Sequence, residues 1–520
     1  MSRTFADFRR KCAAAGVVAC ASLLFARYAD AATITVSAGG NLQAAINSAN
    51  PGDTILLQAG ATFTGNFVLP VKTGSTMITI RSSAPDSALP GPTSRIDPSF
   101  ASQLPKIKSP NTGPALATAP GAHHYTIMGV EFPSTYQGYY IIVALGDASS
   151  AQNSLAQVPH DLVLDRVYLH GDVTYGQKCA IALNSASTTV TNSYVSEIKA
   201  VGQDSQAIAS INGPGPFTIT NNYLEAAGEN ILFGGGDPAI PNLIPSDITV
   251  RNNYLTKQLI WRSQTQWTVK NLFELKNAQR VVVDHNVMEY NWLAAQVGYA
   301  VVFTPRNQDG GCPWCTVQQV QFTNNLVRHI ASCINILGTD NIHPSGTLTG
   351  VTIRNNLFVD VSAANWGGSG RFIQVGNGAQ NVVADHNTVL QDGTSALFAY
   401  GTPMSGFVFT NNIVPDNSWA VFGDNSSPGN ASIATYFPGG IFLKGIFAGS
   451  NPAVYPPNNY YPSSMSAVGF VDLAGGNYHL SATSPYRNGA TDGTDVGCNV
   501  DAIPAQTPVA PQRVHLSVGK

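Results

Sequence analysis

The sequence predicts an all-β protein, a single-stranded parallel β-helix (solenoid) with a short N-terminal capping helix and a C-terminal cap. Two observations support this fold class. A short phrase recurs down the middle of the chain: an apolar strand, two polar residues ending in Asn, and further apolar residues. The segments between copies are rich in Val, Ile, Thr and Phe with alternating polarity, which is typical of strands. A fixed phrase at variable spacing indicates one unit repeated with loops of different length.

The phrase reads FTITNNYL at 217–224 and VVVDHNVM at 281–288. Its second polar residue is always Asn, with spacings of 31, 33, 39, 31, 31 and 25 residues between the copies Asn222, Asn253, Asn286, Asn325, Asn356, Asn387 and Asn412. Asn tolerates the left-handed backbone of a sharp corner, and stacked Asn amides can hydrogen-bond from rung to rung. We therefore interpret this Asn as a corner ladder of the scaffold rather than as a binding site.

The other elements follow in chain order. From Asn41, the apolar residues Leu42, Ala45, Ile46 and Ala49 form one face of a short helix that ends before Pro51-Gly52-Asp53, and a strand is expected at 54–57. Such a helix would cover the open end of the solenoid core. Weaker rungs are expected at 77–81, 125–132, 162–169 and 188–195, with a long excursion at 82–122. Second strands of the stronger units are expected at 229–233, 272–275, 300–304, 334–337 and 372–375.

This organisation divides the chain into a signal peptide (1–31), a parallel β-helix (32–425) and C-terminal rungs with a cap (426–520). An all-helical array does not fit the strand-forming composition. A propeller would need about 40 residues and four strands per blade.

The N-terminus has the pattern of a secretory signal. Arg9, Arg10 and Lys11 precede an apolar run at 12–25, and Ala29-Asp30-Ala31 offers a cleavage site. A secreted or periplasmic location is therefore expected, with an uncleaved anchor or a lipoprotein at Cys20 as alternatives. No later segment is apolar enough to span a membrane. The net charge is −3 and no basic block is visible, so nucleic acid is not an expected partner, and we expect a monomer.

Five cysteines lie beyond the signal segment, namely Cys179, Cys312, Cys315, Cys333 and Cys498. The spacing of Cys312 and Cys315 is C-x-x-C, but the strand-to-helix context of a redox motif and the second pair of a zinc site are missing. A local loop staple or two unrelated thiols fits better. Five histidines give no metal-ligand spacing, namely His123, His124, His285, His329 and His386.

Three parts of the chain carry a family resemblance. These are Gly40–Ile46 with Pro51–Ile55, the Asn rungs, and Asp492-Gly493-Thr494-Asp495-Val496-Gly497. Together they resemble bacterial secreted right-handed parallel β-helix proteins of the pectin-lyase-like group, over about residues 33 to 500. The resemblance implies a polysaccharide substrate, with lyases and glycoside hydrolases both represented in the group. The polygalacturonase pattern of Asn-Thr-Asp, Asp-Asp, Gly-His-Gly and Arg-Ile-Lys is not found.

Charged residues concentrate between 228 and 311, although they make up only 11% of the chain. In the strand around Glu274, alternation turns Phe273 and Leu275 inward and leaves Glu274 and Lys276 on one outer face. Arg306 follows Lys276 by 30 residues, close to one unit, so it should lie on an adjacent rung. A Lys and an Arg on adjacent rungs are similar to the arrangement in alginate and chondroitin lyases of this fold.

The working hypothesis is a lyase that cleaves an acidic polysaccharide by β-elimination, with Lys276, Arg306 and Glu274 as catalytic residues. Elimination needs a cation to neutralise the C5 carboxylate and a base to remove the adjacent proton, and neighbouring cations can lower a lysine pKa. Substrate binding is assigned to charged, amide and indole groups on the same units, namely Glu229, Asp237, Arg262, Arg280, Asn307, Asp309 and Trp314.

Three alternatives remain open from sequence. The same charges could form an outward salt-bridge ladder without catalysis. Glu229, Asp237, Glu274 and Asp309 could instead serve a glycoside hydrolase, whose mechanism depends on carboxylate separations that sequence does not give. The protein could also be a non-catalytic glycan-binding or surface β-helix. No cofactor is indicated. The acidic residues are compatible with Ca²⁺, although no ligand spacing singles it out.

Overall fold

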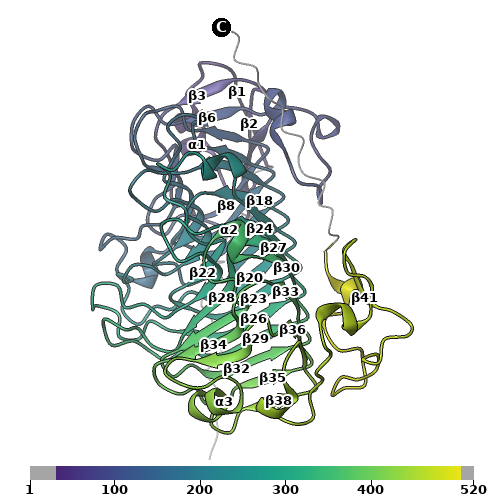
Figure 1. The fold of residues 1–520 in the computed structure, drawn as a ribbon. Coiled ribbons are helices and arrows are strands. Elements are labelled where there is room, and N and C mark those ends of the chain that lie inside the picture. The colour runs from purple at the N-terminus through teal and green to yellow at the C-terminus, as the bar shows by residue number, and fades with distance from the viewer. Residues whose placement is uncertain (1–30, 505–520) are drawn as a thin grey trace, which may run out of the picture.

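The computed structural model describes residues 31–504, so all but the last residue of the expected signal peptide (1–31) lies outside the described residues. Three long, wholly parallel sheets run side by side along the molecule (Figure 1). The chain passes from sheet A to sheet B to sheet C and back to sheet A, so each circuit is one rung of a β-helix. The predicted fold class is confirmed.

Sheet A has 14 strands. They are β1 (Thr33–Val36), β2 (Thr54–Leu57), β5 (Ile78–Ser82), β8 (His123–Met128), β11 (His160–Asp165), β14 (Ala186–Thr191), β17 (Phe217–Thr220), β20 (Ser246–Arg251), β23 (Ala278–Asp284), β26 (Val317–Thr323), β29 (Thr349–Arg354), β32 (Gln380–Asp385), β35 (Val408–Thr410) and β38 (Ile441–Leu443).

Sheet B has 13 strands. They are β3 (Thr62–Thr64), β6 (Lys106–Lys108), β9 (Glu131–Pro133), β12 (Tyr168–His170), β15 (Tyr194–Ile198), β18 (Tyr223–Ala226), β21 (Tyr254–Thr256), β24 (Val287–Asn291), β27 (Leu326–Ile330), β30 (Leu357–Val361), β33 (Thr388–Gln391), β36 (Ile413–Pro415) and β39 (Ile446–Ala448).

Sheet C has 12 strands. They are β4 (Phe67–Leu69), β7 (Leu116–Thr118), β10 (Ile141–Leu145), β13 (Cys179–Leu183), β16 (Gln206–Ser210), β19 (Glu229–Phe233), β22 (Phe273–Leu275), β25 (Tyr299–Phe303), β28 (Ser332–Leu337), β31 (Ile373–Gly376), β34 (Ser395–Tyr400) and β37 (Trp419–Gly423).

The core is one continuous apolar column between the three sheets, because alternate residues of every strand point inward. Helix α1 (Leu42–Ser48) begins after its N-cap Asn41 and buries Leu42, Ala45 and Ile46 at the first rungs, as the sequence predicts. Two further α-helices are α2 (Ala363–Trp366) and α3 (Asn430–Tyr436). The long excursion at 82–122 contains β6 and β7, so it contributes strands to sheets B and C.

The Asn ladder occupies the corner between sheets A and B. Asn325 is representative: its Oδ1 accepts from the backbone N–H and the Nδ2 of Asn286, and its own Nδ2 donates to Asn356 Oδ1. All seven ladder residues are at most 2% exposed. One expectation was wrong, because the left-handed backbone belongs to the preceding residue of each phrase, such as Asn324 with φ 55° or His285 with φ 55°. The second Asn of each phrase is buried instead, and its side chain forms hydrogen bonds with the backbone and side-chain amides of the corner.

After the last rung strand β39, the chain forms a C-terminal cap that includes the antiparallel pair β40 (Phe470–Asp472) and β41 (Asn477–Leu480). The cap lies beside the body and is the yellow segment of Figure 1. Its backbone is bonded to the Asn corner, since Gly497 N–H donates to Asn411 O and Cys498 N–H donates to Thr388 Oγ1. Within residues 31–504, no helix is long and apolar enough to cross a membrane.

Candidate functional site

A cavity of ≈ 250 Å³ opens on the outer face of sheet C, over strands β22, β25 and β28. Eight of its ten lining residues are of polar or charged types, in a chain with few charges. The lining residues are Asn271, Glu274, Lys276, Gln296, Val297, Tyr299, Val302, Thr304, Arg306 and Asn335. All three residues assigned to catalysis from sequence therefore line one cavity.

Strand β22 positions the first pair. Phe273 and Leu275 are wholly buried in the core, so Glu274 points to the opposite face of the sheet. The Lys276 side chain, 16% exposed, places Nζ 3.4 Å from Glu274 Oε1. The ammonium group of Lys276 thus lies at the cavity wall beside a carboxylate that is almost fully buried.

Arg306 lies on the next rung. Its backbone N–H donates to Lys276 O at 2.9 Å, which makes the two residues direct neighbours across the ladder. The Arg306 guanidinium donates from Nη1 to Asp340 Oδ1 at 2.7 Å and to Asn341 Oδ1 at 2.8 Å. Because the Asp340 side chain is fully buried, this ion pair fixes the direction of the guanidinium.

A second acidic group, Glu229, is completely buried on β19, one strand before β22 in sheet C. Its Oε2 accepts from Gln206 Nε2 at 2.9 Å, and its Oε1 lies 3.5 Å from Lys270 Nζ. Burial, followed by the charges of Glu274 and Asp204, raises the pKa of Glu229 to about 7. The carboxyl group is therefore poised to gain or lose a proton near neutral pH.

Lys257 supports this region from within the protein. Its ammonium group is fully buried and donates to the carbonyl oxygens of Ala226, Ala227, Gly228 and Asn271 at 2.6 to 3.0 Å. Burial lowers the pKa of Lys257 to about 7, and the Glu229 carboxylate opposes that effect. Lys257 thus connects the turn before Glu229 with the segment at Asn271 that precedes β22.

Two oxygens at the cavity have no hydrogen-bond partner among the described residues. They are Asn271 Oδ1 and Glu274 Oε2, both buried. Glu229 Oε1 is also without a hydrogen bond and has only the Lys270 contact. Carboxylate and amide oxygens are the ligand types that Ca²⁺ prefers, and Glu229, Asn271 and Glu274 offer such oxygens.

The structure does not bring the remaining sequence-assigned residues into this cavity. Asp237 Oδ2 accepts backbone N–H groups of Asp309 and Gly311 and so organises a loop. Asn307 Nδ2 donates to Pro344 O, and Trp314 Nε1 donates to Leu243 O.

The two other arginines are also committed elsewhere. Arg280 forms a two-pronged pair with Asp247 on sheet A, at 2.7 and 2.8 Å. Arg262 lies over the Trp366 ring at 4.7 Å and donates to Asn365 O. Of the three arginines expected beside Lys276, Arg306 alone lines the cavity.

Sequence reasoning missed several lining residues, including Asn271, Gln296, Tyr299, Thr304 and Asn335. A signal for Asn335 was present: Glu274 pairs with Val302 and Val302 pairs with Asn335, so aligning the units by their second strands places it two rungs from Glu274 on the same face. The long spacing between Asn286 and Asn325 contains the disulfide Cys312–Cys315, which is the local staple considered from sequence.

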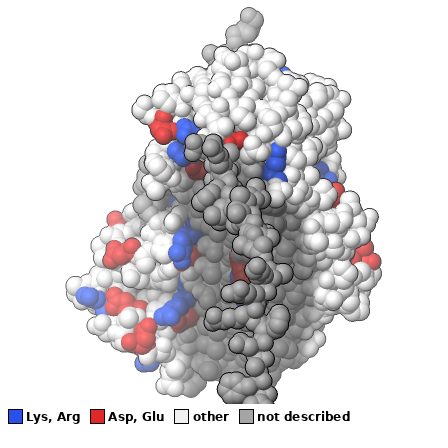
Figure 2. Space-filling view, turned by 180° about the vertical axis from the view of Figure 1, so that it is seen from behind, with Lys and Arg blue, Asp and Glu red and all other residues white. Residues whose placement is uncertain are grey.

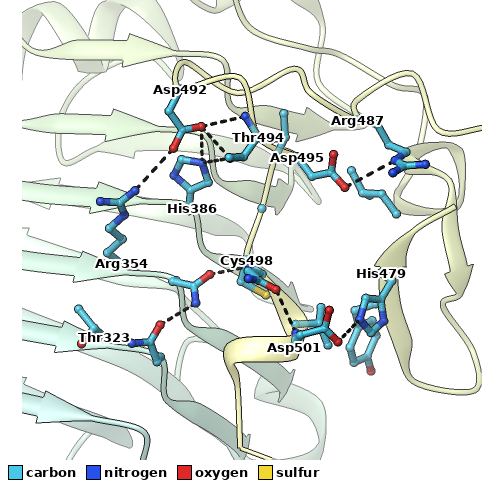
Figure 3. A pocket seen from close by; sticks show the side chains of 18 residues that line it. Thr323, Arg354, His386, His479, Arg487, Asp492, Thr494, Asp495, Cys498 and Asp501 are labelled. Atoms are coloured by element: carbon cyan, nitrogen blue, oxygen red, sulfur yellow. Dashed lines mark hydrogen bonds and ion pairs between the residues drawn. The ribbon is translucent and has the colours of Figure 1, made fainter. Parts of the chain in front are cut away.

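A larger cavity of ≈ 740 Å³ lies between the cap and the corner of sheets A and B (Figure 3). Its charges are matched pairwise: Arg354 with Asp492 at 3.6 Å, Arg487 with Asp495 at 3.8 Å, and His479 with Asp501 at 3.0 Å. The face shown in Figure 2 is mostly uncharged, and several of its red and blue groups lie next to one another. The larger cavity therefore lies in the interface where the cap packs against the body of the β-helix.

Two solved structures are similar to this chain at 13% sequence identity. The PL6 family alginate lyase AlyGC matches with a TM-score of 0.54 over 94% of this chain and 60% of that chain. The catalytic unit of the thermostable GH87 alpha-1,3-glucanase from Streptomyces thermodiastaticus strain HF3-3 matches with a TM-score of 0.50 over 83% of this chain and 70% of that chain. The chain thus spans about three fifths of the length of the alginate lyase.

No protein-family model and no curated protein sequence matches the chain. At this identity the likeness defines the fold. The protein is a right-handed parallel β-helix, as the resemblance of its sequence motifs implies.

Proposed function

We propose that this protein is a polysaccharide lyase that cleaves an acidic glycan by β-elimination in the cavity on sheet C. One observation carries the proposal: Lys276 and Arg306 are neighbours on consecutive rungs and line the same cavity. A uronate bound there presents its C5 carboxylate to the Arg306 guanidinium, which neutralises the negative charge and makes the C5 proton more acidic. The known activities of both structural neighbours, on polysaccharides, are consistent with this class of substrate.

In the proposed reaction Lys276, as the free amine, accepts the C5 proton. The electron pair of the C5–H bond forms the C4=C5 double bond, and the C4–O bond to the leaving sugar breaks. The leaving oxygen then takes a proton from water or from the site. The Glu274 carboxylate, 3.4 Å from the Lys276 amine, orients that amine and stabilises the positive charge that the amine gains with the proton.

Ca²⁺ is compatible with this scheme. Glu229, Asn271 and Glu274 would hold it, and it would supply positive charge that offsets the carboxylates beside Lys276.

The direct test is absorbance at ~235 nm, the signal of the conjugated uronate formed by elimination, during incubation with a panel of acidic glycans. The Lys276→Ala variant should lose a factor of roughly 10²–10⁴ in turnover, the usual contribution of a general base. Lys178→Ala is the matched control, because Lys178 is exposed at the start of another sheet C strand. Full activity of the Lys276→Ala variant would exclude the proposed base.

A glycoside hydrolase is the second candidate, because the raised pKa of buried Glu229 beside Glu274 resembles an acid paired with an ionised carboxylate. New reducing ends without absorbance at ~235 nm would favour hydrolysis. Glycan binding without any cleavage would support a non-catalytic β-helix. With either of the enzymatic functions, we propose a secreted or periplasmic location.

A further inference from the structure

A cluster of histidines lies at the corner between sheets C and A, remote from the cavity on sheet C. His123 and His124 begin β8, and His160 and Asp161 begin the neighbouring strand β11, with His123 and His160 directly paired. In sheet A, β14, β17 and β20 separate β11 from β23, the strand that follows β22 in the chain. At a spacing of about 4.8 Å per strand, the cluster lies about 19 Å along the axis from the rung of Glu274.

Three side chains of the cluster converge. A ring nitrogen of His124, a ring nitrogen of His160 and a carboxylate oxygen of Asp161 all lie within 4.8 Å of one another. His160 Nδ1 is 2.7 Å from Asp161 Oδ2, and His124 Nε2 is 3.8 Å from the same oxygen. In a tetrahedral zinc site with bonds of about 2.0–2.1 Å, ligand atoms are about 3.4 Å apart. The observed separations bracket that value, so small side-chain rotations would complete the site.

The fourth residue, His123, orients two of these groups. Its Nδ1 is 2.7 Å from His124 Nδ1, which leaves Nε2 of His124 to face Asp161. Its ring also stacks on His160, with centroids 4.9 Å apart and planes 13° from parallel. Holding the second nitrogen of a ligating histidine is the common role of residues around a metal's direct ligands.

The electrostatics of the cluster favour a cation. The only ion-pair partners of Asp161 among the described residues are His124 and His160, and neither Lys nor Arg pairs with it. At the same corner further along the solenoid, Asp247 is the second residue of its sheet A strand, as Asp161 is, but its ion-pair partner is an arginine, Arg280.

We propose that His124, His160 and Asp161 form a binding site for a divalent transition-metal cation, best matched by Zn²⁺, with His123 as the orienting residue. Two imidazoles and one carboxylate supply three ligands and leave a position for water. Because the ligands come from β8 and β11, the metal would clamp two consecutive rungs together at their outer corner. This proposal does not depend on the proposed lyase function.

The test is titration of the whole protein with Zn²⁺ by calorimetry, after dialysis against a chelator and back into metal-free buffer. We expect one high-affinity site per chain and a rise in melting temperature when Zn²⁺ is added. The His160→Ala variant should bind at least 100-fold more weakly, and His123→Gln should lose a factor of about 10–100, as for other orienting residues.

His479→Ala is the matched control, because His479 contacts a single carboxylate, Asp501, in the cap. It should leave Zn²⁺ affinity unchanged. The metal-free melting temperatures of all variants establish whether each is folded, and Asp161→Asn provides a second ligand variant if His160→Ala is unstable. Absence of stoichiometric Zn²⁺ binding by the native protein would overturn the proposal. Equal affinities of the native protein and folded His160→Ala or Asp161→Asn would do so as well.

Discussion

The Asn ladder allows a stability prediction that can be worked out bond by bond. In the Asn325→Ala variant four side-chain hydrogen bonds of 2.9 to 3.0 Å are lost, to Asn286 N, Asn286 Nδ2, Val283 O and Asn356 Oδ1. Asn286 Nδ2 still donates to Val250 O, and Asn356 Oδ1 still accepts a hydrogen bond from the backbone N–H of residue 325. The Asn286 backbone N–H loses its acceptor inside a corner that is wholly buried.

An orphaned buried donor costs about 1–3 kcal/mol, and each of the other lost bonds about 0.5–1.5 kcal/mol. We therefore expect the variant to lose about 2.5–7.5 kcal/mol of unfolding free energy, locally if the rungs unfold separately. Hydrogen exchange at the Asn286 amide reports the local opening, and denaturant unfolding reports the total. Asn381→Gly is the control. Asn381 is an exposed residue near the start of β32 with a left-handed backbone, and its side chain makes one hydrogen bond, to Thr349 Oγ1. It should change stability by less than about 1 kcal/mol. Unchanged exchange at Asn286 in the Asn325→Ala variant would refute the scaffold role of the ladder.

Three further predictions concern the site. The pKa of Glu229 is raised from 4.5 to about 7 in the folded protein, so ionisation of this carboxyl group lowers the unfolding free energy by about 3 kcal/mol as pH rises from about 4.5 to 7, and has no effect below 4.5. The Glu229→Gln variant should therefore melt at a higher temperature than the native protein at pH 8 and at the same temperature at pH 4. The same difference in melting temperature at both pH values would contradict this. Ca²⁺ should raise the melting temperature of the native protein but not of Glu274→Gln, and an equal rise in both would remove Glu274 from the cation site. Arg306→Lys should keep a charge near Asp340 but lose the planar guanidinium whose Nη1 binds both Asp340 and Asn341, so steady-state kinetics should show a lower kcat with the fold retained. A native kcat would argue against charge neutralisation by Arg306.

Much of the fold was predictable because a solenoid repeats its local signals. The helix after Asn41 and the strands at 54–57 and 229–233 follow from periodicity within a few residues, and the structure contains them. The conformation of the corner was not predictable to the same precision. Two polar residues stand side by side there, and sequence does not say which takes the left-handed backbone and which turns inward.

The site was predictable only where a repeat distance could be applied. The spacing from Lys276 to Arg306 is close to one unit, and the structure makes them ladder neighbours. Arg262 and Arg280 lie closer in sequence to Lys276 than Arg306 does, but the path of the chain carries Arg280 to sheet A and Arg262 to the Trp366 ring. Proximity along the chain therefore did not translate into proximity in space, because each rung distributes its residues over three faces.

The sequence by itself determined the solenoid, its repeating corner and the inward and outward faces of its strands, because these depend on local periodicity and on contacts between adjacent units. Only the tertiary structure decided which charged groups line the same cavity and which form ion pairs elsewhere. Loops of different length shift side chains between faces, and partners such as Asp340 for Arg306 or Lys270 for Glu229 lie 34 and 41 residues away in the sequence. The cluster of His124, His160 and Asp161 became visible for the same reason. His124 and His160 are 36 residues apart in a solenoid whose units have no fixed length, and only the pairing of β8 with β11 brings the ligands together.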